Sequence, residues 1–217
     1  MATVLKNDQH AIWTIVVSYI LWGCGVPLAM FTMCMYFHRL TMHAIPPREV
    51  IVSVFLPLGP LGQGSFAIMQ LGKDLLNVLP RTHNIPLVPM AGEIAYVSGI
   101  LVAFVMWGFG LVWFFFAVAS IARSKFPFNL GWWGFTFPLG VYTVATTTLA
   151  QELPSGFFRV LGTIFSVSVV LLWLVVASWT MAKAWTGEIF FAPCLQEWRQ
   201  GVEEKARRAS VATAVEP

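Results

Sequence analysis

The stretch FPFNLGWWGFTFPLGVYTVATTTLAQE, residues 126–152, decides the fold class of this 217-residue chain. From residue 126 to residue 151 it has 26 consecutive positions without Asp, Glu, Lys or Arg. A helix of about 20 apolar residues is enough to cross a hydrocarbon core of about 30 Å. We therefore predict a transmembrane helix over residues 127–151. Pro138 lies in its middle, removes one backbone hydrogen bond and favours a kink.

Four further uncharged runs indicate that the chain crosses the membrane repeatedly. They cover residues 9–38, 50–72, 94–122 and 160–182. With 58% hydrophobic and 11% charged residues, the composition is typical of a polytopic membrane protein. We predict an all-α integral membrane protein whose membrane domain spans 11–185, with five transmembrane helices at about 11–36, 50–72, 95–122, 127–151 and 160–182. A polar lead (1–10), an external loop (73–92) and a cytosolic tail (186–217), partly disordered, complete the prediction.

The basic residues predict how the five helices are oriented. With the C-terminus in the cytosol, nine of the 13 Lys and Arg residues fall on the cytosolic side. Cytosolic loops of membrane proteins carry an excess of Lys and Arg. We therefore predict a cytosolic C-terminus.

Small and polar residues form a stripe on each of two predicted helices. In the fourth helix the stripe recurs at steps of four and three residues, the spacing of one helical face. It comprises Thr136, Gly140, Thr143, Thr147 and Gln151. The second helix has a matching stripe of Gly59, Gln63, Phe66 and Gln70. These faces are predicted to line a pore or to contact a neighbouring helix, and the two glutamine amides fit anion binding and interhelical hydrogen bonding equally well.

Prolines interrupt the same two helices. Pro57, Pro60 and Pro138 are predicted kink positions, because proline cannot donate a backbone hydrogen bond. Pro-Leu-Gly occurs at 57–59 and again at 138–140, and each copy is followed by a smoother, aromatic-rich helix. The recurrence favours a parallel repeat of hairpins, with the kinked members inside.

Several function classes lack support in the sequence. A membrane-embedded enzyme needs a catalytic constellation, but the predicted spans contain no H-E-x-x-H and no His, Asp or Cys cluster. Cys24, Cys34 and Cys194 have no metal-ligand spacing, so no metal site or cofactor is predicted. The basic residues are scattered among loops, which argues against nucleic-acid binding.

Two motifs carry a family resemblance. LGWWGFTFPLG (130–140) and PLGPLGQGSFAIMQLG (57–72) resemble the tellurite-resistance/dicarboxylate transporter family. That family includes fungal sulfite efflux pumps, malic acid permeases and plant slow anion channels, and the second motif resembles the sulfite pumps most. The resemblance implies a homotrimer of ten-helix subunits, each with kinked inner helices around a pore. This chain would correspond to helices six to ten, as a truncated or half-length member.

The resemblance also implies a function and a gate. It implies efflux of an anion, sulfite in the first place, through the plasma membrane and its lipid bilayer, with Phe137 as the ring that closes the pore. Dicarboxylate permeases and anion channels of the same family are the alternatives. A third possibility is a non-transporting partner that assembles with full-length relatives.

Overall fold

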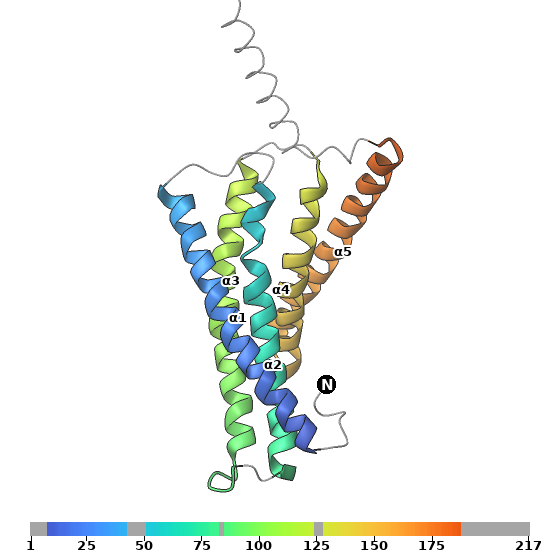
Figure 1. Cartoon of the computed structure of the whole chain (residues 1–217). Helices are drawn as coiled ribbons and strands as arrows, with labels where there is room; N and C mark the ends of the chain where they lie inside the picture. Colours follow the sequence, from blue (N-terminus) through green and yellow to red (C-terminus); the bar gives the residue numbers. More distant parts are fainter. Residues whose placement is uncertain (1–7, 43–50, 83–84, 124–127, 188–217) are drawn as a thin grey trace, which may run out of the picture.

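The computed structural model describes residues 8–42, 51–82, 85–123 and 128–187, which form helices and no strand. The elements are α1 (Asp8–Met42), the short 3-10 helix η2 (Ile51–Phe55), α2 (Leu58–Thr82), α3 (Ala91–Ala122), η3 (Leu130–Trp132), α4 (Trp133–Glu152) and α5 (Gly156–Trp185). Consecutive long helices run in opposite directions (Figure 1). The prediction of an all-α fold with five long helices is confirmed for these residues. Residues 1–7 of the predicted lead and 188–217 of the predicted tail lie outside them.

Within the part of the chain that the structure describes, four segments are long and apolar enough to span a membrane: α1, η2 with α2 (from Val52), α3 and α5. The remaining helix, α4, has 20 residues. At a rise of about 1.5 Å per residue it is about 30 Å long, the thickness of a hydrocarbon core. The chain is therefore a multi-pass membrane protein.

Four of the long helices, α1, α2, α3 and α5, extend past a charged residue that bounds the predicted span, whereas α4 ends at Glu152. α2 continues from the predicted end at Gly72 to Thr82, so the external loop predicted over 73–92 is wrong for its first half. A charged side chain marks where a helix leaves the hydrocarbon, but its backbone hydrogen bonds continue into the polar interface. For the same reason α5 begins at Gly156 and not at residue 160.

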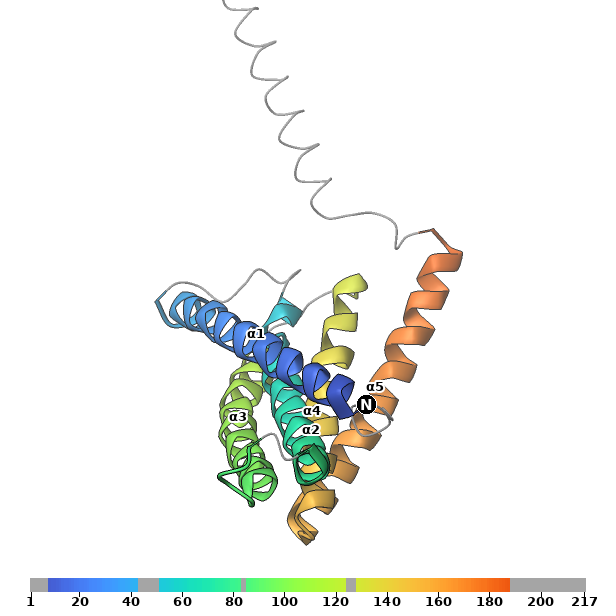
Figure 2. The same cartoon turned by 60° about the horizontal axis from the view of Figure 1, so that its bottom comes forward.

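Burial separates inner from outer helices. Ten of the 25 residues of α2 are buried, compared with three of the 35 in α1 and eight of the 32 in α3. Ten of the 20 residues of α4 are buried, but only three of the 30 in α5. Viewed from below, α2 and α4 lie in the middle of the bundle (Figure 2). The two helices with the Pro-Leu-Gly sequence are thus the inner ones.

Glycines bring the backbones of neighbouring helices together. A Cβ atom on Gly62 of α2 would lie 2.6 Å from the backbone nitrogen of Tyr142 in α4. On Gly72 it would lie 2.9 Å from the carbonyl oxygen of Ala95, and on Gly99 2.8 Å from that of Ile68, both between α2 and α3. Small residues permit this close approach in membranes, where dispersion contacts replace the hydrophobic effect. The glycines of α2 therefore fix its position against α3 and α4.

Buried hydrogen bonds add a second set of links around Tyr142. Its ring stacks on Trp107 of α3 at a centroid distance of 5.8 Å, and its hydroxyl donates to the Trp107 carbonyl at 2.7 Å. The indole nitrogen of Trp107 donates in turn to Thr146 Oγ1 at 2.9 Å. Ser65 of α2 donates to the carbonyl of Ala103 at 3.0 Å. In hydrocarbon an unpaired polar group is costly, so these bonds hold α2, α3 and α4 as one unit.

Candidate functional site

The inner helices α2 and α4 each keep one side uncovered by the rest of the chain. On α2 this side carries Pro60 and Gln63, and on α4 it carries Phe137, Val144 and Gln151, all exposed. α1 and α5 diverge toward the upper end of the bundle (Figure 1). We refer to the exposed sides of α2 and α4 together as the open face.

Phe137 joins the two inner helices at this face. Its side chain is 66% exposed although it belongs to an inner helix, near the beginning of α4. A Cβ atom on Gly59 would lie 3.9 Å from Cε1 of the Phe137 ring, so the ring of α4 lies beside the start of α2. Two predicted site residues, far apart in the sequence, are thereby brought together.

The predicted threonine stripe of α4 is divided between two environments. Thr136 and Thr143 are buried, and their hydroxyls donate to the carbonyl oxygens of Trp133 and Leu139 in their own helix. Gly140 has open space where a Cβ atom would lie. Thr147 is half-buried, and its hydroxyl donates back to the helix as well. On this helix Phe137, Gly140 and Thr147 thus lie nearer the open face than Thr136 and Thr143.

The stripe of α2 is less buried than that of α4 except at Gly59. Gln63 is exposed, and Phe66 and Gln70 are half-buried. Among the residues that the structure describes, the amides of Gln63 and Gln70 have no hydrogen-bond partner. The described chain thus gives no support for interhelical hydrogen bonding by these amides, and their N–H groups remain available on the open face.

The three predicted kink prolines occupy different positions. Pro57 lies in the turn that separates η2 from α2, where the helix is interrupted. Pro60 lies in the first turn of α2, where a missing backbone N–H needs no partner. Pro138 is buried inside α4, which remains helical on both sides of it.

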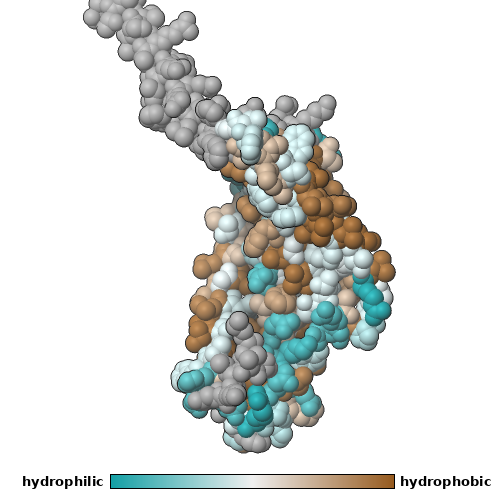
Figure 3. Space-filling view, turned by 90° about the vertical axis from the view of Figure 1, so that its right-hand side faces the viewer, coloured by the Kyte–Doolittle hydropathy of each residue, from teal (hydrophilic) through white to brown (hydrophobic). Residues whose placement is uncertain are grey.

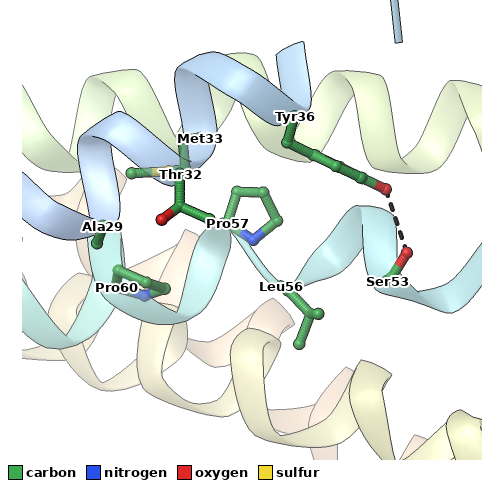
Figure 4. A pocket seen from close by; sticks show the side chains of 8 residues that line it. All are labelled: Ala29, Thr32, Met33, Tyr36, Ser53, Leu56, Pro57 and Pro60. Atoms are coloured by element: carbon green, nitrogen blue, oxygen red, sulfur yellow. Dashed lines mark hydrogen bonds between the residues drawn. The ribbon is translucent and has the colours of Figure 1, made fainter. Parts of the chain in front are cut away.

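A mostly apolar pocket of about 360 Å³ lies beside the interruption of α2 (Figure 4). Pro57, Pro60 and Leu56 line it from one side, and α1 contributes Met33 and Tyr36 from the other. The Tyr36 hydroxyl lies 3.2 Å from Ser53 Oγ, a hydrogen bond that ties α1 to η2. Among the described residues that line this pocket, none has a charged side chain.

Sequence reasoning did not find the ion pair at the lower end of the inner helices. Lys73 Nζ of α2 lies 2.6 Å from Glu152 Oε1 at the end of α4. The other carboxylate oxygen accepts a hydrogen bond from the hydroxyl of Tyr96 in α3 at 2.7 Å. The carboxylate is 9% exposed and the lysine side chain 48%. The two residues are 79 positions apart, and the predicted loop after Gly72 placed Lys73 outside any helix.

The comparisons with known proteins cover most of the chain. The family described as voltage-dependent anion channel matches residues 1–181. A sulfite efflux pump of Arthroderma otae is 53% identical over 190 residues, covering 88% of this chain and 50% of that protein. A sulfite efflux pump of Candida albicans is 28% identical, and the match covers 77% of this chain and 38% of that pump. An uncharacterized transporter of Methanocaldococcus jannaschii is 26% identical, and the match covers 82% of this chain and 48% of that transporter.

The extent of these matches bears on what the chain contains. The chain spans about half the length of the Arthroderma pump that it matches. No solved structure matches the chain significantly. The family match covers well over half of the chain and includes both motif helices. The chain therefore belongs to the voltage-dependent anion channel family.

Proposed function

We propose that this chain forms one side of a pore for small anions in the plasma membrane, with sulfite as its substrate and efflux as the direction. The observation that carries the proposal is the open face, where the exposed Phe137 ring, near the beginning of α4, lies beside Gly59 at the beginning of α2. The identity to the Arthroderma pump supports sulfite as the anion. We place the C-terminus in the cytosol, as the basic residues predict.

The proposed lining follows from exposure, except for Gly59, which is buried but lies beside the Phe137 ring. From α2 it takes Gly59, Gln63, Phe66 and Gln70. From α4 it takes Phe137, Gly140 and Thr147. Thr136 and Thr143 are left out because their side chains are buried and their hydroxyls are bound within the helix.

Such a lining would bind anions weakly. On the open face it offers the glutamine amides and no Lys or Arg along this middle part of either helix. Weak binding suits conduction, because an ion that enters must also leave. Phe137 is the proposed gate, since its ring is large, exposed and anchored next to the buried Pro138.

The open face needs a cover before it can enclose a pore. Polar groups such as the Gln63 amide are costly against lipid. We propose that the helices which family members have in addition to these five cover the open face. We also propose that the complete subunits form a homotrimer, as the resemblance implies. A subunit that assembles with full-length relatives without transporting by itself would use the same face.

Sulfite efflux from liposomes tests the proposal. One set of liposomes contains this chain alone, and a second contains it together with the half of the Arthroderma pump that it does not match. We expect efflux only in the second set, and Phe137→Ala should raise it there. Rapid efflux from the chain alone would refute the need for a cover, and none from either set would refute anion transport.

A further inference from the structure

A polar pocket lies between the lower end of α4 and the beginning of α5, away from Phe137. Its volume is about 530 Å³, and its lining comes from both helices and from Pro154 in the turn between them. The lining includes Thr147, Gln151, Pro154, Arg159, Thr163 and Ser166. In Figure 3 hydrophilic surface gathers toward the same lower end of the bundle.

Two side chains in this pocket have hydrogen-bond donors to offer. Arg159 and Gln151 are both exposed, and within the described ranges neither side chain has a hydrogen bond or an ion pair. The hydroxyls of Thr163 and Ser166 already donate to the carbonyl oxygens of Arg159 and Gly162. The guanidinium and the amide are therefore the groups that can bind a ligand that only accepts hydrogen bonds.

The local electrostatics favour a negative ligand. α5 begins at Gly156, and its N-cap residue Ser155 makes no side-chain cap hydrogen bond. The first-turn N–H groups carry the positive end of the helix dipole, and this turn contains no acidic residue. The nearby carboxylate of Glu152 is already bound by Lys73 and Tyr96. Arg159 thus adds a full positive charge where the helix end is already positive.

We propose that this pocket binds a small oxyanion, held by the fork of Arg159 and by the Gln151 amide. The planar guanidinium offers parallel N–H groups that fit two oxygens of one anion, which a halide cannot match. Only the role of the site depends on the proposed function: it collects or releases the transported anion at one end of the open face. A free oxyanion such as sulfite and the phosphate of a lipid headgroup share this chemistry.

Calorimetric titration of the purified full chain in neutral detergent tests the site. Sodium sulfite is titrated at constant ionic strength, and a short-chain phosphatidylglycerol is titrated separately. Arg159→Gln should weaken binding about tenfold, the effect of losing one charge-assisted contact. The affinity of Arg159→Lys, which keeps the charge but loses the forked guanidinium, should lie between that of Arg159→Gln and that of the wild type. Gln151→Glu should abolish binding.

Arg81→Gln is the matched control. Arg81 is an exposed arginine at the same end of the bundle, at the end of α2, 4.0 Å from Asp8 and not part of the pocket. This variant should bind sulfite as the wild type does. Thermal unfolding of each variant shows whether it is folded, and Arg159→Lys replaces Arg159→Gln if the latter is not.

The outcomes separate the site from the transport function. Equal loss of binding in the Arg81 and Arg159 variants, or no binding of either anion by the wild type, would overturn the site. Binding of the lipid alone, with the same dependence on Arg159, would keep the site and identify the headgroup as its ligand. Sulfite binding that depends on Arg159, without efflux from liposomes that also contain the other half of the Arthroderma pump, would overturn the transport proposal and leave the site standing.

Discussion

Gly62→Ala should separate the two inner helices, because Gly62 is where their backbones touch. The new Cβ atom would lie 2.6 Å from the nitrogen and 2.7 Å from the Cα atom of Tyr142. Both neighbours are backbone atoms, so no side chain can rotate away. Ordinary contact begins near 3.4 Å. The helices must therefore move apart by about 0.8 Å at this point.

The expected cost follows from two opposing effects. Inserting a methyl group into a packed interior costs about 1–3 kcal/mol, and contact with backbone favours the upper end. Alanine is preferred over glycine in a helix by about 1 kcal/mol. The free energy of unfolding should therefore fall by about 2 kcal/mol, which lowers the melting temperature of a domain of this size by about 4–8 °C.

The assay is the melting temperature of the purified protein in detergent, followed by size-exclusion chromatography of heated samples. Gly140→Ala is the control, because a Cβ atom there meets nothing within 4 Å. It should leave the melting temperature unchanged or raise it slightly. Equal melting temperatures for Gly62→Ala and the wild type would refute the close packing of α2 on α4.

Three further experiments address the gate, the ion pair and the topology. In liposomes that also contain the other half of the Arthroderma pump, Phe137→Ala should raise the sulfite flux per molecule. A fall in flux, together with a fall in the free energy of unfolding on the order of 3 kcal/mol, would show that the ring only packs. Lys73→Ala should destabilise the protein by about 1–3 kcal/mol, because it leaves the Glu152 carboxylate with one partner fewer. Adding Glu152→Gln to the same chain should restore part of this stability. If thermal unfolding shows that the effects of the two substitutions simply add, the pairing is contradicted. A cysteine at Ser210, outside the described residues, should react with an impermeant reagent only after cells are permeabilised, and reaction in intact cells would reverse the topology.

The helices could be predicted from the sequence because charge is excluded from hydrocarbon, but their ends could not. Lys73 interrupts the uncharged run, yet α2 continues for nine more residues after it. The pattern of hydrophobic residues indicates which part of a helix lies in hydrocarbon. Where the helix ends depends instead on its local hydrogen bonds and on the elements that it packs against. In α2 the helix after Lys73 is supported by the ion pair with Glu152 and by the buried Val78.

The candidate site could be predicted only in part for a similar reason. Spacing identified Thr136 and Thr143 as members of one helical face, but it does not say which neighbour covers that face. In the structure both are buried, and the neighbouring Phe137 remains exposed. Arg159 escaped notice as a site residue because its importance depends on the pocket between α4 and α5, which no local pattern reveals.

The threonines of α4 also bear on how the chain enters the membrane during synthesis. The hydroxyls of Thr143, Thr146, Thr147 and Thr148 each donate to a carbonyl three or four residues earlier in the same helix. These bonds form as soon as the helix does and need no neighbouring helix. A newly made α4 can thus leave the translocation machinery with these four hydroxyls already satisfied, although it is less apolar than α3 and α5. Its docking against α2 and α3 can then follow as a separate, later event in the bilayer.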